Sequence, residues 1–574
     1  MTANSLNLID LNDYLGPSQL CTKPNIPQAK QEPPSLSKTL ISLDDQPPPP
    51  PPLNEPLPKA QITLNDCLAC SGCITSSESI LVSLQSVQEV RKEILKPNRY
   101  PILSISSHSL ASFVAYNQLD SLSTGFKVLK KYFTRSHNFA LVLDTNFAQR
   151  LHLLESQREF KEQRRRQEEG SRRSAKSPIL ASSCPAWICY AEKTQGKNGI
   201  LEMISRVKSA QQIQGALLKS PRFAASVGLG SVEEIYHVCV MSCYDKKLEA
   251  SRPDFQSDDE RIKDVDCVLT TREVQDMIQE DGFDIVEAAQ ETEESEPPID
   301  CHRPNNQVGI PIWIDRPPPI GSSSGGYLFN LLRASVPTDR GNLHDRLRLT
   351  VDRKRGSDYV EFRLQLAHAS LPPNGIQDGV STEELETLFY GALFYGFKNL
   401  QNLIRKIAPS ASSSTGTTNP RARVMGRRRK EQQQGADGAR GEAGRTYDFV
   451  EVMACPSGCV NGGGQIPIGT HLGSIPSSSG GPTNKQWIAK LEQVYFQSPS
   501  STCPSSEDPQ QLIHSAGLAD TLYVADQHDA SDHAFIHSWM EAWGFLADQA
   551  SRDRTFLTSY RAVEPESNGF AVQW

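Results

Sequence analysis

The sequence predicts an α/β fold in which parallel-rich sheets are flanked by helices. Between Tyr100 and Leu154, short apolar runs alternate with segments of helical periodicity, a pattern typical of parallel strands joined by crossover helices. Two later apolar runs, Ile235–Met241 and Tyr447–Val452, have the length of buried strands, and a cysteine follows each within a few residues. Because ligands bind beyond the carboxyl ends of strands in open α/β sheets, these cysteines are candidate site residues.

Composition and charge limit the possible classes of function. The 574 residues suffice for two or three domains, and the formal net charge of −8 gives no overall basic surface for direct nucleic-acid binding. No run approaches the roughly 20 apolar residues that span a bilayer, and the first residues lack the pattern of a signal or transit peptide. We therefore expect no membrane partner and a cytoplasmic location, with the nucleus as a second possibility. The 13 cysteines should stay reduced there, which favours metal binding over disulfides.

Individual elements follow from local periodicity. Helices are expected over Ser107–Tyr116 and Ser123–Tyr132, and a strand over Phe139–Leu143. Alternating apolar and charged residues in Arg346–Leu366 predict antiparallel strands, and Leu385–Ile407 has the pattern of an amphipathic helix.

Low-complexity sequence interrupts these elements. Residues 1–60 are expected to be a flexible segment that carries Cys21, because the proline run Pro47–Pro52 is typical of a polyproline II linker. The rest of the chain divides into a cluster-binding segment, 61–99, and a larger domain, 100–574, whose charged, proline-bearing or Ser/Gly-rich stretches predict insertions near 155–176, 284–310, 408–445 and 473–484.

Residues 61–99 contain three closely spaced thiols. Cys67, Cys70 and Cys73 form a C-x2-C-x2-C pattern, which matches the start of the bacterial ferredoxin run that binds an iron–sulfur cluster. Ser77 stands where the run has its fourth cysteine, so a fourth ligand must come from elsewhere. Zinc is the alternative metal, although no second cysteine or histidine pair follows at finger spacing.

Two single cysteines stand at predicted strand ends. Cys184 precedes Pro185, which suits the first position of a helix, so the thiol should lie where helix N–H groups favour a thiolate. A role as nucleophile is the less favoured alternative, since no histidine is adjacent. Cys243 follows the run Ile235–Met241 directly. Three other cysteines are expected to be core residues: Cys189, Cys239 and Cys267.

The densest signal is the stretch from Glu451 to Pro467. It places Cys455 and Cys459 after a strand-like run and follows them with the three glycines 462–464. Thiolates suit soft metals, and residues without a Cβ would let backbone N–H groups approach an inorganic sulfide or an anion. A glycine-rich turn with two buried cysteines is the plainer alternative. A second glycine-rich turn, residues 321–326, lacks the lysine of a phosphate-binding loop.

Together these motifs resemble the iron-only hydrogenase family. The segments around Cys184, Cys243 and Cys455–Cys459 are similar to its three cluster-binding motifs, and the likeness extends from about Tyr100 to Val563. With the N-terminal cysteines, the chain most resembles the eukaryotic cytosolic iron–sulfur cluster assembly factors of this hydrogenase-like family, related to the prelamin A recognition factor.

This resemblance implies a two-lobed domain with two 4Fe–4S clusters. The implied ligands of the first cluster are Cys21, Cys67, Cys70 and Cys73, and those of the second are Cys184, Cys243, Cys455 and Cys459. The implied role is non-enzymatic: maturation of extramitochondrial iron–sulfur proteins by transfer of preassembled clusters to apoproteins. The implied partners are apoprotein clients and a scaffold and targeting complex that includes a WD40 propeller protein, with Trp574 as a contact.

Departures from the hydrogenase motifs separate this role from the alternative, an iron-only hydrogenase or related redox enzyme. The position before Cys184, a proton-carrying cysteine in hydrogenases, is Ser183, whose high pKa makes it a poor relay near neutral pH. Ser242 and Ser457 replace a proline and a glycine, and Ile466 interrupts the third motif. Hydrogen turnover is therefore not expected. A zinc-bound structural protein is the remaining alternative.

Overall fold

The computed structural model describes residues 82, 84–169, 177–196, 198–256, 262–295, 309–336, 346–367, 385–407, 446–467, 484–497 and 532–563. The predicted ligands of the first cluster and Trp574 lie outside these residues, as do the insertions predicted near 408–445 and most of that near 473–484.

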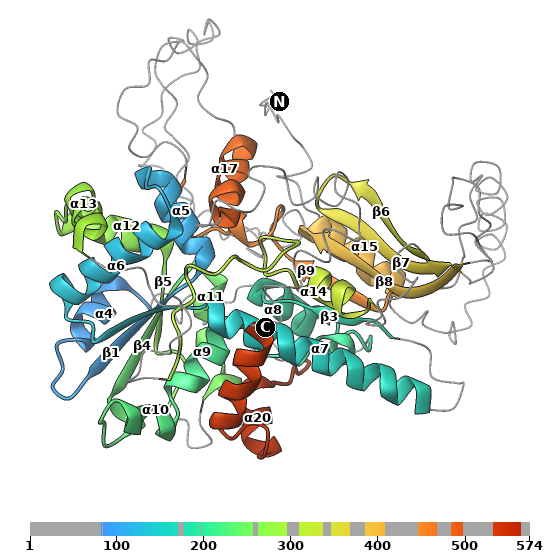
Figure 1. Cartoon of the computed structure of the whole chain (residues 1–574), viewed down its shortest axis with the longest axis horizontal. Coiled ribbons are helices and arrows are strands. Elements are labelled where there is room, and N and C mark those ends of the chain that lie inside the picture. The colour runs from blue at the N-terminus through green and yellow to red at the C-terminus, as the bar shows by residue number, and fades with distance from the viewer. Residues whose placement is uncertain are drawn as a thin grey trace, which may run out of the picture.

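The first of two sheets, sheet A, is entirely parallel. Its strand order is β2-β1-β4-β5, with all three neighbouring pairs parallel. All four carboxyl ends therefore lie at one edge, the one that faces sheet B (Figure 1). Its strands are β1 (Tyr100–Ile105), β2 (Leu141–Asp144), β4 (Ile235–Met241) and β5 (Cys267–Thr270).

The second sheet, sheet B, is mixed. In the order β3-β9-β8-β7-β6, the first three strands run parallel and the last three antiparallel. Antiparallel strands can be joined by a short turn, and β6 and β7 are joined in this way. Its strands are β3 (Ile179–Ala181), β6 (Leu347–Arg355), β7 (Tyr359–Ala367), β8 (Leu385–Tyr395) and β9 (Phe449–Met453).

Helices cover both faces of sheet A because its strands are apolar on both sides. One face packs a core around Phe113, Phe126 and Phe133, and the other a core around Phe147 and Trp313. The helices around this sheet are α4 (Val87–Glu93), α5 (Ser107–Asn117), α6 (Leu122–His137), α7 (Asn146–Glu169), α9 (Ala210–Leu218), α10 (Pro221–Ser226), α12 (Thr271–Glu280), α13 (Ile285–Ser295), α17 (Asn484–Phe496) and α20 (Gln549–Phe556).

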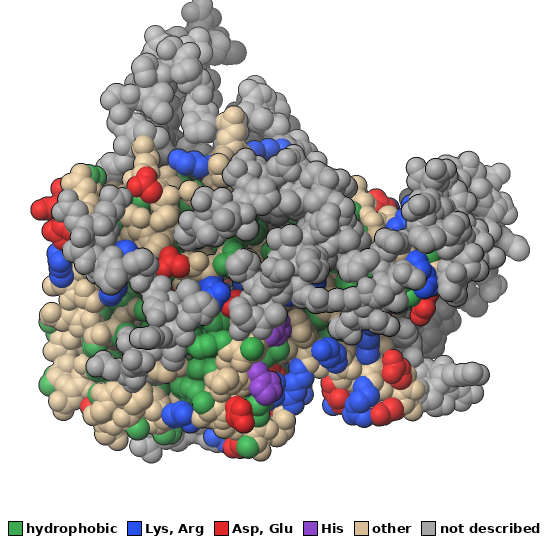
Figure 2. Space-filling view, in the orientation of Figure 1, with side chains coloured by type: hydrophobic (Ala, Val, Ile, Leu, Met, Phe, Trp, Pro, Cys, Tyr) green, Lys and Arg blue, Asp and Glu red, His purple; other side chains and the backbone are tan. Residues whose placement is uncertain are grey.

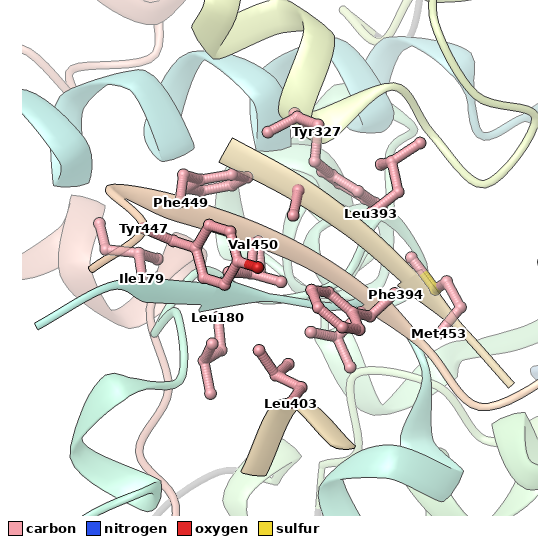
Figure 3. Close-up of a cluster of buried hydrophobic side chains, with 14 of the residues drawn as sticks. Ile179, Leu180, Tyr327, Leu393, Phe394, Leu403, Tyr447, Phe449, Val450 and Met453 are labelled. Carbon is pink, nitrogen blue, oxygen red and sulfur yellow. The ribbon is translucent and has the colours of Figure 1, made fainter. Parts of the chain in front are cut away.

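Sheet B has its own core, built from its central strands. Figure 3 shows Phe394, Phe449 and Val450 of β8 and β9 beside Leu180 of β3 and Leu403. The helices that contribute to this core are α8 (Pro185–Thr194), α14 (Tyr327–Ala334) and α15 (Phe397–Ile407). Between the two sheets, α8 packs against the short helix α11 (Asp245–Ala250) (Figure 1).

Most of the predicted elements are confirmed. Helices α5 and α6, strand β2, and the antiparallel pair β6–β7 lie where the periodicity placed them. The helix predicted over Leu385–Ile407 is wrong in its first half, because Leu385–Tyr395 is the strand β8 and only Phe397–Ile407 is helical. The end of β8 is buried on both faces, so the strand shows no alternation that would separate it from a helix.

Two predicted insertions also differ from the structure. Residues 284–310 were expected to form an exposed loop, but Ile285–Ser295 is the helix α13, whose Ala288 is buried against α6. The helical character predicted near 155–176 is present up to Glu169, yet Glu155 and Phe160 are buried, so the first turns of this segment belong to the core.

The surface seen in Figure 2 carries both signs of charge. Lys, Arg, Asp and Glu side chains are interspersed on this face, and no large area of one sign is visible. No helix in the described part of the chain combines the length and the apolar character that crossing a membrane requires.

A buried carboxyl at the end of β2 should make stability depend on pH. Asp144 is fully buried and accepts hydrogen bonds from the N–H groups of Asn146 and Trp313, both at 2.7 Å. Burial raises its pKa to about 7 from the ordinary 3.8. The folded state thus holds a proton that the unfolded state has released, so stability falls as pH rises from about 4 to about 7, by on the order of 3 kcal/mol.

The comparison of thermal unfolding at pH 5 and pH 8 tests this expectation. In Asp144→Asn, which cannot ionise, the difference in Tm between the two pH values should shrink, although the protein is less stable at both because an amide cannot accept both N–H bonds. Glu202→Gln, at an exposed position, is the control and should keep the full difference. An unchanged difference in Asp144→Asn would contradict the assignment.

Candidate metal centre

Four of the predicted ligands lie together between the two sheets. Cys184 follows β3, Cys455 follows β9 and Cys243 follows β4, each by two or three residues. Cys459 begins the 3-10 turn Cys459–Asn461 in the same loop as Cys455. Three thiols therefore come from strand ends of sheet B and its loop, and one from sheet A. This is the edge that the fold makes available for a ligand.

Burial and mutual repulsion keep these thiols neutral in the protein alone. Burial raises the pKa of Cys184 to about 12 and those of Cys243 and Cys455 well above the ordinary 9. It also raises the pKa of Cys459. The charges that the four sulfurs would carry add to the shift, because each is close enough to oppose ionisation of others. A positively charged group is needed for these residues to become thiolates.

The donor set suits a metal group larger than one ion. All cysteines in the described part of the chain are free thiols. Within the same residues, no three His, Cys, Asp or Glu side chains are close enough to bind a single metal ion. In a 4Fe–4S cluster each thiolate binds a different iron atom, so four sulfurs need not converge on one point. The residues present thus fit such a cluster.

A buried ion pair lies beside the thiols. Lys246 and Glu249 of α11 are joined at 2.7 Å, with side chains only 12% and 10% exposed. Although burial alone would lower the pKa of Lys246, Glu249 and the thiols of Cys243 and Cys459 raise it. Lys246 therefore stays protonated, and its charge in turn lowers the pKa of Cys243 and Cys459.

The sequence around Cys184 fixes this thiol at the start of α8. Cys184 is the residue before the first helical position, and Pro185 follows, as predicted. The Ser182 hydroxyl donates to the carbonyl oxygen of Val452 at 2.6 Å and accepts from the N–H of Cys184 at 3.0 Å. These two hydrogen bonds hold Cys184 next to strand β9. The N–H group of Ala454 also hydrogen-bonds to the thiol, which favours its ionised form.

The glycine run after Cys459 brings the two sheets into contact. That its glycines bring N–H groups to a sulfide or an anion stays a prediction. In the structure, Gly464 donates its N–H to the carbonyl oxygen of Ser242 at 2.9 Å. A Cβ on Gly462 would lie 2.4 Å from the same oxygen, and one on Gly464 would lie 2.7 Å from Cγ2 of Thr270. The glycines thus allow the loop of sheet B to pack directly on the strand ends of sheet A.

The sequence did not predict the residues whose hydrogen bonds hold the Cys455–Cys459 loop and the strand that leads to it. The Ser324 hydroxyl accepts from the N–H of Cys459 at 3.0 Å. The carboxylate of Glu451, fully buried in β9, accepts from the hydroxyls of Ser322 and Tyr395, both at 2.6 Å. The serines of the glycine-rich turn 321–326 were the available signal, because short hydroxyls suit close contact with a backbone loop.

The hydroxyl of Ser183 lies within the site. It hydrogen-bonds both to the thiol of Cys459 and to the phenol of Tyr327. The residue at the hydrogenase relay position therefore hydrogen-bonds to the thiol of Cys459 and to a side chain of α14. This arrangement makes Ser183 a supporting residue of the thiol pocket.

Ser457 has a backbone conformation that favours glycine. Its φ is +59°, and its N–H donates to Asp358 at 2.8 Å. The left-handed region costs a residue with a side chain about 1–2 kcal/mol, whereas glycine loses about 0.5–1 kcal/mol of chain entropy. We expect Ser457→Gly to raise Tm by roughly 1–2 °C, measured by scanning calorimetry. Ser457→Ala keeps the strain and should not raise it; a lower Tm for the glycine variant would contradict this account.

The remaining predicted residues divide into two groups. Cys239 and Cys267 are buried in the core, as expected, but Cys189 on α8 is half-buried, so that assignment is corrected. Cys21, Cys67, Cys70 and Cys73 lie outside the described residues.

Comparison with known proteins identifies the family of this chain. Residues 100–463 match the family model for the C-terminal domain of the iron only hydrogenase large subunit. The chain is similar to cytosolic iron-sulfur assembly component 3 of Mus musculus, with 34% identity over 100% of this chain and 99% of the mouse protein. It is also similar to cytosolic Fe-S cluster assembly factor NAR1 of Mycosarcoma maydis, with 31% identity over 100% of both chains.

Solved structures show the same fold. The apo FeFe-hydrogenase HydA1 from Chlamydomonas reinhardtii, in a variant form, superposes with a TM-score of 0.51 at 20% identity and covers 83% of this chain and 98% of its own. A second hydrogenase structure, HydA(deltaEFG), gives a TM-score of 0.53 with the same identity and coverage. At this identity the likeness concerns the fold alone, whereas the full-length relatives identify the group. The chain belongs to the family of cytosolic iron–sulfur cluster assembly factors and carries the C-terminal domain of the iron-only hydrogenase large subunit.

Proposed function

We propose that this protein is a component of the cytosolic machinery that matures iron–sulfur proteins, and that it acts without catalysing a reaction of its own. One observation carries the proposal: four thiols from three loops of two sheets lie close enough together for each to oppose the ionisation of others. Four thiolates at this separation need a compensating positive charge. The full-length relatives, which are named as cytosolic assembly factors, support the same role.

We further propose that Cys184, Cys243, Cys455 and Cys459 bind one 4Fe–4S cluster. Such a cluster supplies the positive charge that stabilises four thiolates. The chain contributes the geometry around it. Ser182, Ser183 and Ser324 hold the thiol-bearing loops through hydrogen bonds, and Lys246 adds a fixed positive charge. Loop contacts across the two sheets would exclude water from the sulfurs.

The first 4Fe–4S cluster is proposed on Cys67, Cys70 and Cys73, with Cys21 as the remote fourth ligand. The described residues that follow these cysteines are anchored on sheet A. The Gln85 amide donates to the carbonyl oxygen of Lys247 at 2.7 Å and accepts from the N–H of Val268 at 2.9 Å. Gln85 thus joins the chain to the lobe that carries Cys243. A cluster held partly by a distant cysteine should exchange more readily, which suits it as cargo for apoproteins.

Hydrogen turnover is not part of the proposal. Ser183 stands at the relay position and engages Cys459 and Tyr327, and a hydroxyl is a poor proton relay near neutral pH. We expect no hydrogen evolution with reduced viologen from protein of measured iron content. Turnover above the level of a Cys459→Ala variant would overturn this part of the proposal.

Iron and acid-labile sulfide analysis, with EPR, tests the ligand sets. Anaerobically purified protein should contain about eight iron and eight sulfide per chain, the content of two 4Fe–4S clusters. Cys67→Ala and Cys459→Ala should each lose a different half. Zinc in place of iron, or loss from only one variant, would contradict the proposal.

Cluster delivery and docking need separate tests. Loaded protein should activate an iron–sulfur apoenzyme in the presence of a chelator that captures free iron, and the Cys67→Ala variant should not. The proposed WD40 partner should be retained by the full chain in a pull-down and lost when Trp574 is deleted. Unchanged retention would exclude Trp574 as the contact.

A further inference from the structure

The last described residues form a strap, defined here as residues 557–563, across the helices next to the site. It follows α20, which packs on α9 (Figure 1). At its start, the N–H of Thr558 donates to the carbonyl oxygen of Arg206 at 2.7 Å. At its end, the N–H of Val563 donates to the carbonyl oxygen of Glu192, in the last turn of α8, at 3.1 Å. The strap is therefore fixed at both ends.

The strap covers an ion pair that joins α8 to the segment after α11. Arg252 donates two hydrogen bonds to the carboxylate of Glu192, both at 2.7 Å, and the two side chains are 18% and 6% exposed. The N–H of Arg561 donates to the same carboxylate at 3.2 Å, and the ring of Tyr560 lies 6.0 Å from the guanidinium carbon of Arg252. A bidentate pair kept from water is much stronger than an exposed one.

This ion pair lies on the elements that carry two proposed ligands. Helix α8 begins directly after Cys184, and α11 begins two residues after Cys243. The two helices pack against each other. Glu192 and Arg252 lie at the opposite ends of these elements from the cysteines. Helix α8 is rigid and only about 15 Å long. A movement at the ion pair would therefore change the distance between the thiols of Cys184 and Cys243.

We propose that the strap is a positioning device for the second cluster site. While the strap is bound to α8, it excludes water from the ion pair of Glu192 and Arg252 and holds α8 against α11. Its release loosens the hold of Cys184 and Cys243 on the cluster. This inference rests on the proposed function, in which those residues are ligands. Only residues 564–573 lie between the strap and Trp574 in the sequence, so a partner that binds Trp574 would bind close to the strap along the chain.

One glycine allows the strap to be displaced without touching the ion pair. A Cβ on Gly196 would lie 2.4 Å from Cβ and 3.2 Å from Cα of Ala562, too close for the strap to remain in place. The test uses Gly196→Ala in full-length protein carrying Cys67→Ala, so that any iron belongs to the second site. Iron release to a chelator should be at least threefold faster. Amide hydrogen exchange without cluster should rise in 557–563 and in α8.

A matched control and three outcomes decide the result. Gly230→Ala, whose Cβ would meet only the Glu234 carboxylate at 3.6 Å, should change neither readout. Faster exchange in the strap with unchanged α8 exchange and iron release would overturn the proposal, as would unchanged exchange in the strap. If the Cys67→Ala protein holds no iron at all, the proposed second cluster fails instead, and exchange in α8 still decides whether the strap positions this helix. Glu192→Gln, which weakens the ion pair directly, should reproduce the α8 effect.

Discussion

Replacing Cys184 with alanine is expected to remove the iron of the second site and leave that of the N-terminal site. Its thiol is the ligand proposed at the β3–α8 junction, and burial raises its pKa to about 12. The three remaining thiols would leave one iron atom of a cluster without a protein ligand, and in the described part of the chain no other cysteine follows the carboxyl end of a strand at this edge. Iron should therefore fall from roughly eight to roughly four per chain, the content of one 4Fe–4S cluster.

The same helix provides the control for this prediction. Cys189 lies on α8 five residues after Cys184, is half-buried and is not a proposed ligand. Cys189→Ala should keep the iron, the sulfide and the EPR signal of the unaltered protein. The prediction fails if Cys184→Ala retains full iron content, or if Cys189→Ala loses as much.

Some of the site was predictable because its signals are local. A buried strand followed by a cysteine can be seen in the sequence at Cys243 and at Cys455, and the pairing of Cys184 with Pro185 identifies a helix start. The fold class follows from the alternation of strands and helices between Tyr100 and Leu154. These features depend on residues within about ten positions of each other, which is the range over which periodicity and capping act.

The supporting residues could not be predicted because they depend on contacts between distant segments. Ser324 and Cys459 are 135 positions apart in the chain, and Ser182 and Val452 are 270 apart. The pairing of β3 with β9 creates the second contact, and the first depends on the packing of the turn 321–326 against the loop after β9. Nothing in the local sequences states this pairing or this packing. For the same reason, local periodicity does not separate α15 from β8, whose burial on both faces is a property of the assembled sheet.

Several hydrogen bonds join the two sheets at the site itself. Gly464 donates its N–H to Ser242 and accepts from the N–H of Arg272 at 3.0 Å. The side chain of Gln465 accepts from the hydroxyl of Thr271 at 2.9 Å and donates to the carbonyl oxygen of His108 at 3.0 Å. Relative placement of the lobes and the geometry of the thiols are thus set by the same few residues. A cluster bound by all four thiols would in turn stabilise this junction, because ligands that bind only the folded form add to its stability.

A methyl group at Gly462 is therefore expected to disrupt the second site severely. The added Cβ would lie 2.4 Å from the carbonyl oxygen of Ser242, 3.0 Å from its carbonyl carbon and 3.2 Å from Cβ of Cys243. None of these atoms is the end of a flexible side chain, so the loop carrying Cys459 must move away from the strand end carrying Cys243. We expect Gly462→Ala to lose most of the iron of the second site and to cost about 1–3 kcal/mol of stability, the usual range for overpacking.

Three measurements on one set of variants would show whether the contact between residue 462 and Ser242 causes the loss of iron. Iron content and EPR should show the N-terminal cluster intact in Gly462→Ala, and thermal unfolding should show the loss of stability. Gly464→Ala, whose Cβ would lie 2.7 Å and 2.8 Å from Cγ2 and Cβ of Thr270 and 3.1 Å from the carbonyl oxygen of Ser242, should lose iron in the same way, because Cβ of Thr270 and this carbonyl group are fixed by the backbone. Gly230→Ala should behave as the unaltered protein. Full iron content in Gly462→Ala would mean that the two ligand loops do not meet through this contact, and the two-sheet origin of the site would have to be abandoned.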